Sequence, residues 1–257
     1  MTTNFVEVNY QTSSISVNTN AMGMREMQER AFEARNSQYL LLKSPPASGK
    51  SRALMFIALD KMKYQNIKKT IIAVPEKSIA GSFLDTDLTT YGFYSDWQVK
   101  PENNLCIDAS NTSVEFKRFL KSDDSVLVCT HSTLRNSANS LPASDFDGCL
   151  IAIDEFHHVS SNDESRLGSL LESIMDQSTA HVLAMTGTYF RGNSEAVLKS
   201  EYEVQFDKVT YNYYEQLSGY KHLKSLAIGY HLDELQNQIT KTSRRVQIPL
   251  KKINRLI

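Results

Sequence analysis

Short apolar runs alternate with stretches of helical spacing along most of this chain. Runs of this kind, bounded by polar residues, are typical of strands that are buried on both faces of a parallel sheet. The clearest runs span residues 39–42, 70–74, 125–129, 149–153 and 181–185. The segments between them predict helices over 23–36, 52–63, 114–120 and 167–175, and another that starts near Lys77. The alternation predicts an α/β fold, a mostly parallel sheet with helices on both faces.

The pattern is weaker near both ends of the chain and in one central segment. Residues 105–107 form a short apolar run, which we interpret as a weak strand. Residues 1–22 are rich in Ser, Thr and Asn, and the alternation loosens after Phe190. We therefore expect an N-terminal arm over 1–22, one α/β domain over 23–230, and a basic linker or the start of a further lobe over 231–257.

Composition narrows the classes of function. Apolar residues make up 41% of the 257 positions, charged residues make up 22%, and the net charge is -1. A chain of this length can bury a core without disulfides or metals. Without a global basic field, nucleic-acid binding cannot be argued from net charge. It is not excluded either, because backbone N–H groups and a few side chains are enough to hold phosphates.

Cysteine spacing and hydropathy indicate the compartment. Cys106, Cys129 and Cys149 form no CxxC or Cys/His cluster, so we predict no zinc site. Widely spaced, unpaired cysteines fit a reducing intracellular setting. No apolar stretch reaches the roughly 18 residues that span a bilayer, and the first residues do not resemble a signal peptide. We therefore expect a soluble, cytoplasmic protein without a membrane partner.

A phosphate-binding loop is the strongest chemical signal. The segment SPPASGKS (44–51) follows a predicted strand and opens a predicted helix. Backbone N–H groups at a helix N-terminus bind phosphates, Gly49 permits close approach, Lys50 reaches the outer phosphates, and a Ser51 hydroxyl can bind Mg²⁺. Ser44 stands where the general pattern has its first glycine, and the alternative is a chance GKS in a loop. The candidate ATP-binding residues here are Ser44, Pro45, Pro46, Ala47, Ser48, Gly49, Lys50, Ser51 and Arg52.

Two acids follow the apolar run 149–153. Asp154 at the end of a strand can hold Mg²⁺, and Glu155 can polarise an attacking water as the catalytic base. The alternative is an ordinary strand followed by a solvated acidic turn. The phosphate loop upstream favours the functional interpretation, because both segments would meet at the carboxyl edge of one sheet.

These motifs together resemble those of superfamily-two DEAD/DEAH-box helicases, especially the restriction-enzyme motor subunits. DEFH (154–157) is similar to their DEAH box, and SPPASGKS to their motif I. Weaker likenesses are the RxxQ helix (25–28), motif Ia (73–75), motif Ib (128–131) and motif III with its extension (186–191). Tyr189 departs from the proline expected there. The resemblance covers about residues 24–230 and implies the N-terminal RecA-like ATP-binding lobe, a P-loop NTPase fold.

The resemblance also implies roles for individual residues. The catalytic set would be Lys50, Asp154, Glu155 and His157, and the metal ligands Ser51 and Asp154. Gln28, supported by Arg25, would recognise adenine. Coupling between the nucleotide and nucleic-acid sites would involve Thr186, Gly187, Thr188 and Arg191. The alternatives are an exposed helix glutamine, a core histidine, and hydroxyls that only cap strand ends.

Nucleic-acid contacts are implied at Pro75, Lys77, Thr130 and His131, at the ends of two further strands. Hydroxyls and helix N-termini at such places suit contact with the phosphate backbone rather than with bases. Plain loop residues are an equally good interpretation of each of these positions. The resemblance favours DNA over RNA.

The function implied is the ATP-binding lobe of an ATP- and Mg²⁺-dependent nucleic-acid helicase or translocase. Its family splits the ATPase site between two lobes, and residues 192–257 are too few for a second RecA-like lobe. The partner would therefore be a lobe outside this sequence, and the chain alone would hydrolyse ATP slowly without unwinding. A P-loop switch that remodels a protein partner and a non-catalytic scaffold module are the alternatives. Stimulation of ATP turnover by nucleic acid would distinguish a helicase from the protein-remodelling switch. Turnover that depends on Glu155 would exclude the non-catalytic scaffold.

Overall fold

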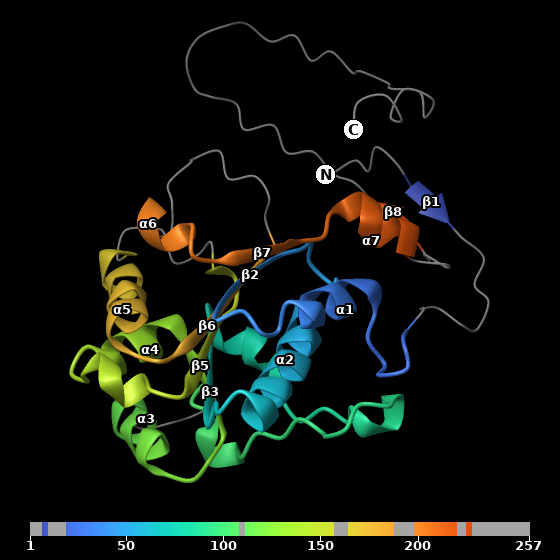
Figure 1. Ribbon diagram of the computed structural model, residues 1–257. Coiled ribbons are helices and arrows are strands. Elements are labelled where there is room, and N and C mark those ends of the chain that lie inside the picture. The colour runs from blue at the N-terminus through green and yellow to red at the C-terminus, as the bar shows by residue number, and fades with distance from the viewer. Residues whose placement is uncertain are drawn as a thin grey trace, which may run out of the picture. The chain divides into compact units, whose positions relative to one another are not determined.

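A six-stranded, fully parallel sheet forms the centre of the fold (Figure 1). The computed structural model describes residues 7–9, 19–107, 111–156, 164–187, 198–219 and 225–227. The strand order is β4-β3-β5-β6-β2-β7. The strands are β2 (Tyr39–Lys43), β3 (Lys69–Val74), β4 (Val126–Thr130), β5 (Cys149–Ile153), β6 (His181–Thr186) and β7 (Asp207–Thr210). The predicted α/β fold is confirmed.

Alternate residues of each strand enter two separate cores, one on each face of the sheet. In β2, Leu40 and Leu42 pack on one face and Leu41 on the other. Both faces are apolar, which explains why the strands are continuous apolar runs rather than alternating ones. The first core is covered by α1 (Glu26–Glu33) and α2 (Lys50–Tyr64).

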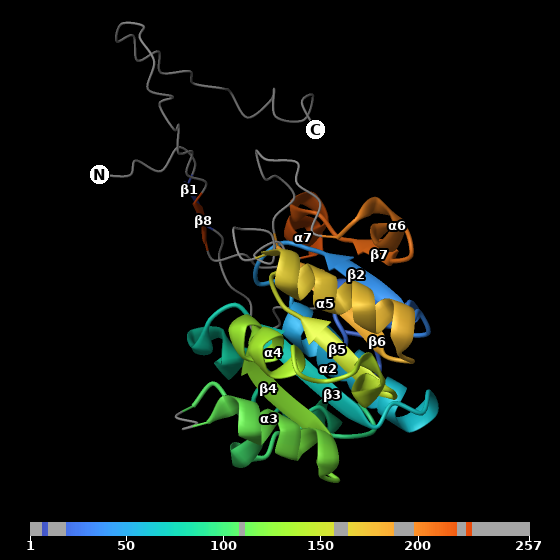
Figure 2. The same ribbon diagram turned by 90° about the vertical axis from the view of Figure 1, so that its left-hand side faces the viewer.

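The second core is covered by three helices on the opposite face, α3 (Thr112–Lys121), α4 (His131–Ala138) and α5 (Glu164–Gln177), as Figure 2 shows. Thr130 begins α4 as its N-cap, with its hydroxyl accepting the backbone N–H of Thr133 at 3.2 Å. Asn111 caps α3 in the same way through Val114. Side-chain caps of this kind satisfy backbone donors that would otherwise lack a partner.

The structure corrects two of the predicted elements. The segment after Lys77 is a 3₁₀-helix, η1 (Lys77–Phe83), rather than an α-helix. Residues 105–107 are not a strand. Asn104 makes one isolated parallel bridge to Val128, and Leu105 donates one backbone hydrogen bond to Val128. Both segments contact β4, the strand at one edge of the sheet.

Several short elements were not predicted at all. They are η2 (Thr89–Tyr91), η3 (Pro101–Asn103), η4 (Ala143–Phe146), α6 (Ser200–Glu203) and α7 (Tyr213–Gly219), together with the helix α4 and the edge strand β7. β7 pairs with β2 in the register Leu40↔Asp207 to Lys43↔Thr210. The charged residues at its start explain why an apolar pattern did not indicate it.

A second, separate unit contains the short strands β1 (Glu7–Asn9) and β8 (Ser225–Ala227), which pair in antiparallel fashion. The unit that holds the parallel sheet spans residues 11–223. Among the described residues, no helix has the length and apolarity that crossing a membrane requires.

Candidate nucleotide-binding site

The three central strands β5, β6 and β2 end side by side at the carboxyl edge of the sheet. Asp154 follows β5, Thr186 ends β6 and Ser44 follows β2. The backbone N–H of Ser44 donates to the Thr186 carbonyl at 3.1 Å, and the N–H of Asp154 donates to the Ala73 carbonyl at 2.9 Å. Parallel pairing therefore brings the phosphate-loop, acidic and motif III segments together, although they are far apart in the sequence.

The phosphate loop turns from β2 into α2 through two left-handed residues. Ala47 has φ 61° and Gly49 has φ 95°, and Gly49 is the N-cap of α2. The Ser44 and Ser48 hydroxyls lie 2.9 Å apart and brace the base of the loop. A Cβ at Gly49 would also come within 2.5 Å of the Gln28 side-chain nitrogen, so a larger residue there would displace the Gln28 amide. The loop thus presents the N–H groups at the start of a 15-residue helix, a favourable place for an anion.

Lys50 is buried beneath this loop. Its Nζ donates to the carbonyls of Ser44 at 3.0 Å and Pro45 at 3.2 Å. Burial lowers the pKa of Lys50, while the nearby charges of Glu155 and Asp154 oppose that shift. A cation held by loop carbonyls can exchange them for phosphate oxygens without leaving its place.

The two acids lie on the other side of Lys50. Asp154 is buried, and its desolvation, reinforced by the charge of Glu155 and opposed by Lys50, raises the pKa of Asp154 to about 6. Glu155 has a left-handed backbone, φ 47°, and its Oε2 accepts the N–H of Gly187 at 3.2 Å. A Cβ at Gly187 would lie 3.3 Å from the Glu155 carboxylate and 3.4 Å from Lys50 Nζ, so glycine keeps this corner open.

Gln28 and Arg25 approach the same loop from α1. The Gln28 amide is buried, donates from Nε2 to the Gly49 carbonyl at 3.2 Å, and accepts the backbone N–H of Arg25 at its Oε1 at 2.9 Å. The structure therefore brings both residues to the phosphate loop. Their predicted contact with adenine stays a prediction.

Comparison with known proteins identifies the family. The sequence model of the type III restriction enzyme res subunit matches residues 14–191. This chain belongs to that res-subunit family. The protein named "Putative ATP-dependent helicase YeeB" of Bacillus subtilis (strain 168) is 54% identical over 257 residues, which cover 98% of this chain and 43% of that protein. The chain thus spans less than half the length of this curated relative.

Solved structures show the fold of this res-subunit lobe. The Hef helicase domain of Pyrococcus furiosus superposes with a TM-score of 0.52 at 16% identity, over 76% of this chain and 40% of that one. The DUF1998 helicase MrfA, in a structure with DNA and AMPPNP, gives a TM-score of 0.52 at 14% identity, over 79% and 31%. These likenesses show that the domain has the RecA-like fold of helicase domains, as the sequence motifs predicted.

The residues predicted to contact nucleic acid lie at the ends of β3 and β4 in the res-subunit lobe. Pro75 is half-buried and Lys77 is exposed. Thr130 is buried and already caps α4, whereas His131 Nε2 lies 2.9 Å from the Asp154 carbonyl. The histidine therefore links the end of β4 to the acidic segment. Contact of these four residues with nucleic acid stays a prediction.

Three predicted site residues of the res-subunit lobe, His157, Thr188 and Arg191, lie outside the described residues. Among the others, Arg52 lies over the Tyr91 ring, with 5.4 Å from its Cζ to the ring centroid. Gln216 of α7 was missed by sequence reasoning. Its Nε2 donates to the Pro46 carbonyl of the phosphate loop at 3.2 Å. No local motif could indicate it, because it lies 170 residues from its partner.

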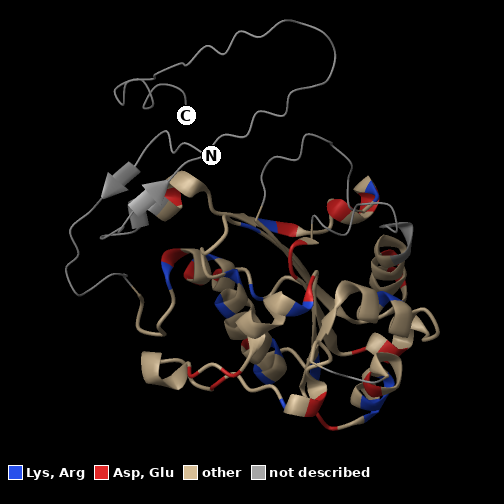
Figure 3. Ribbon diagram, turned by 180° about the vertical axis from the view of Figure 1, so that it is seen from behind, with Lys and Arg blue, Asp and Glu red and all other residues tan. Residues whose placement is uncertain are grey.

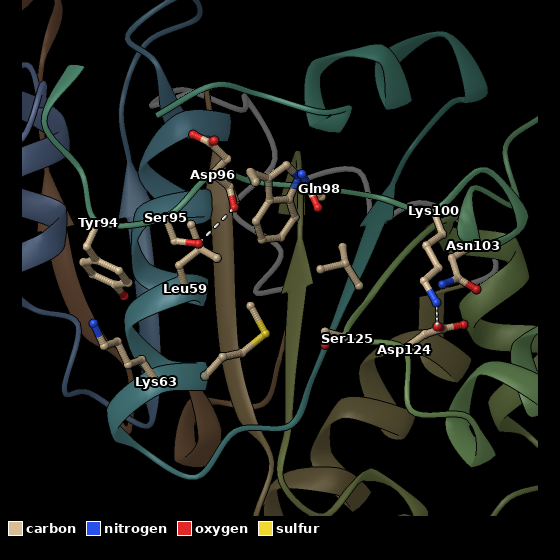
Figure 4. A pocket seen from close by; sticks show the side chains of 13 residues that line it. Leu59, Lys63, Tyr94, Ser95, Asp96, Gln98, Lys100, Asn103, Asp124 and Ser125 are labelled. Carbon is tan, nitrogen blue, oxygen red and sulfur yellow. Dashed lines mark hydrogen bonds and ion pairs between the residues drawn. The ribbon is translucent and has the colours of Figure 1, made fainter. Parts of the chain in front are cut away.

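A pocket of about 620 Å³ lies elsewhere in the lobe, between α2, the segment 94–103 and the start of β4 (Figure 4). Its charged groups have partners in the protein: Lys100 pairs with Asp124, Asp96 accepts the Leu88 and Thr89 N–H groups, and Lys63 lies over the Tyr94 ring. Figure 3 shows Lys and Arg intermixed with Asp and Glu over the described elements. No broad stretch of one charge stands out in this view.

Proposed function

We propose that this chain is the ATP-binding lobe of a DNA helicase or translocase driven by Mg-ATP hydrolysis. The observation that carries the proposal is the meeting of Lys50, the acids Asp154 and Glu155, and the Gly187 N–H below the open N-terminus of α2. A bare phosphate loop would serve any nucleotide-binding switch. The buried Asp154 and the half-buried Glu155 beside the lysine add the groups that hydrolysis requires.

The residues present fit a bound Mg²⁺. Asp154 is a buried carboxylate whose raised pKa reflects a charge that lacks full compensation in the protein alone, and the Ser51 hydroxyl stands in the first turn of α2. Carboxylate and hydroxyl oxygens are the ligands that Mg²⁺ prefers. When bound, the ion would neutralise charge on the outer phosphates of ATP. Lys50 would hold the same phosphates through its ammonium group.

Glu155 would act as the general base. Its carboxylate is held by the Gly187 N–H and lies beside Lys50, so it is oriented before any substrate arrives. A carboxylate in that position can accept the proton of an attacking water. The link from Glu155 to Gly187 also ties the base to the motif III strand, which supports a coupling role for Thr186 and Gly187.

Gln28 and Arg25 would recognise adenine, since both lie beside the phosphate loop. DNA would contact the ends of β3 and β4 at Pro75, Lys77, Thr130 and His131, and the bond between His131 and the Asp154 carbonyl would connect that contact with the ATP site. The partner would be a second RecA-like lobe, which would complete the ATPase site. The greater length of the YeeB relative and the DNA in the MrfA structure support this assignment.

The test is nucleotide binding and turnover by this chain, with single-stranded DNA, double-stranded DNA or RNA added in separate arms. Binding is followed with a fluorescent ATP derivative, with and without Mg²⁺. We expect Lys50→Ala to weaken binding by about 10- to 100-fold, because it removes charge-assisted hydrogen bonds to phosphate. The exposed Lys68→Ala is the matched control and should bind as the wild type does.

Glu155→Gln separates binding from chemistry. We expect it to retain ATP affinity and to lower the slow intrinsic turnover by about 100-fold or more, since the base contributes only to the chemical step. Fast turnover by the isolated wild-type chain would contradict the split-site assignment. ATP binding without any salt-sensitive affinity for DNA or RNA would instead favour a switch that acts on a protein partner.

A further inference from the structure

The edge strand β7 carries the chain directly to the phosphate loop. β7 pairs with β2 up to Thr210, and the Tyr211 N–H extends this ladder by donating to the Lys43 carbonyl at 2.8 Å. Lys43 is the last residue of β2 before the loop. Asn212 then starts α7 with a reciprocal cap: its side chain accepts the Glu215 N–H at 2.9 Å, and the Glu215 carboxylate accepts the Asn212 N–H at 2.8 Å.

Arg30 of α1 fastens this short helix. Its Nη1 donates to the Thr210 carbonyl at 2.9 Å and to Glu215 Oε1 at 2.8 Å, and its guanidinium lies 5.3 Å from the Tyr211 ring centroid. The Tyr211 hydroxyl in turn donates to the Glu215 carbonyl at 3.1 Å. α1 and α7, which are far apart in the sequence, are thereby joined on the side of the sheet where the loop lies.

Each of these two helices sends one glutamine amide to a carbonyl of the loop. Gln28 of α1 donates to Gly49, and Gln216 of α7 donates to Pro46, both at 3.2 Å. The direction of the second bond matters. In a trans peptide the carbonyl and the following N–H point in opposite directions, so a Pro46 carbonyl turned toward Gln216 turns the Ala47 N–H away from α7.

Ala47 is also the strained residue of the loop. A left-handed backbone is unfavourable for an alanine, and such a conformation persists only where its surroundings hold it. The Gln216 bond to the neighbouring carbonyl is a contact that can do so. We propose that Gln216 is a positioning residue for ATP, held in place by the Arg30–Glu215 ion pair, and that it fixes the Pro46–Ala47 peptide in its phosphate-accepting orientation.

This inference rests on the proposed function, because it assigns Gln216 a part in the same ATP site. Its consequence is specific to phosphate. Loss of the bond leaves the fold and the adenine side of the site intact and lets the Pro46–Ala47 peptide rotate, which weakens every ligand that the loop binds through phosphates. ATP and inorganic pyrophosphate should therefore lose affinity by the same factor.

The experiment measures the affinity of the chain for fluorescent ATP directly and for pyrophosphate by competition. We expect Gln216→Ala and Gln216→Glu each to lose about 3- to 10-fold in both affinities, which is the range for one hydrogen bond, with Tm within about 2 °C of wild type. Gln216→Glu is the sharper variant, because its carboxylate cannot donate to the Pro46 carbonyl. Tyr214→Ala, an exposed position on the same helix, is the control and should change neither affinity.

The outcomes separate the two proposals. If wild type does not bind ATP, or Lys50→Ala binds it equally well, the proposed function fails. If both of those expectations hold and the Gln216 variants bind ATP and pyrophosphate as wild type does, only the role of Gln216 is wrong. A loss of ATP affinity without loss of pyrophosphate affinity also overturns it. Should Gln216→Glu not fold, Gln216→Ala alone decides, and Arg30→Lys, which keeps the charge but not the forked contact, should show a smaller loss of the same kind.

Discussion

The helix α2 has a buried lysine at each end, and the two ends differ in how that charge is held. Lys61, near the amino edge of the sheet, donates to the Ser37 carbonyl at 2.8 Å and to Gln65 Oε1 at 3.1 Å, and its Nζ lies 2.8 Å from His181 Nδ1. These partners lie just before β2, at the C-cap of α2 and at the start of β6. Within the described residues, Lys50 donates to two carbonyls of the phosphate loop, next to two acids.

Backbone strain also differs between the amino and carboxyl edges of the sheet. Non-glycine residues with left-handed backbones occur in the described residues at Ala47 and Glu155, in the candidate site, and at Asn66, just after α2. Asparagine tolerates this conformation, whereas alanine and glutamate do not. The amino edge therefore uses a residue that suits its geometry, whereas the carboxyl edge keeps backbone strain beside the buried Asp154. Such a combination is expected where a ligand completes the structure.

The largest expected effect comes from removing the lysine that is fully partnered. Lys61→Ala leaves three part-buried acceptors without their donor and opens a cavity at a buried position, so we expect the free energy of unfolding to fall by about 2–4 kcal/mol. Chemical denaturation measures it, with the exposed Lys68→Ala as the control. ATP affinity should be unchanged in the molecules that remain folded. A loss of stability no greater than that of Lys50→Ala would remove the distinction between the two ends.

At the carboxyl edge we expect a substitution of the buried charged residue to increase stability rather than to reduce it. The folded-state pKa of Asp154 is about 6, above its ordinary value of 3.8, so its charge is unfavourable in the nucleotide-free fold at neutral pH. Asp154→Asn removes that charge at constant shape and should raise the free energy of unfolding by about 1–2 kcal/mol at pH 7.5. The same variant should lose the Mg²⁺ dependence of ATP binding. Asp145→Asn, an exposed carboxylate, is the control and should leave stability unchanged.

Sequence reasoning was most successful where chemistry and strand periodicity coincide. The runs before Ser44 and Asp154 predicted buried parallel strands, and the structure confirms both strands and their shared edge. Sequence reasoning failed for residues and strands whose place in the fold depends on tertiary contacts. β7 carries charges because it lies at the sheet edge, and Gln216 reaches the loop only through that edge pairing. The partners of Lys61 could not be foreseen either, since His181 is distant in sequence and reads as an ordinary residue at the start of a strand.

The smallest expected effect is a pair of opposite pH dependences. Burial, helped by the charge of Lys61, lowers the pKa of His181 to about 4 from 6.5. Between pH 6.5 and pH 4, His181 binds a proton in the unfolded chain but not in the folded protein, so the free energy of unfolding falls as pH falls. At Asp154 the fold takes up the proton first, so that site gains stability as pH falls from about 6 to 4.

Denaturation of wild type, His181→Gln and Asp154→Asn at pH 7.5 and pH 5.0 measures both slopes. Gln keeps an acceptor for Lys61, so the variant isolates the titration. Relative to wild type, His181→Gln should improve by about 1 kcal/mol on acidification, and the advantage of Asp154→Asn should shrink by a similar amount. If the two sites changed stability with pH in the same direction, the proposed difference between the two edges of the sheet would be wrong. Opposite slopes would show that protonation of His181 destabilises the amino edge, whereas protonation of Asp154 stabilises the carboxyl edge. The proposed Mg²⁺ would stabilise the carboxyl edge in the same way, by neutralising Asp154.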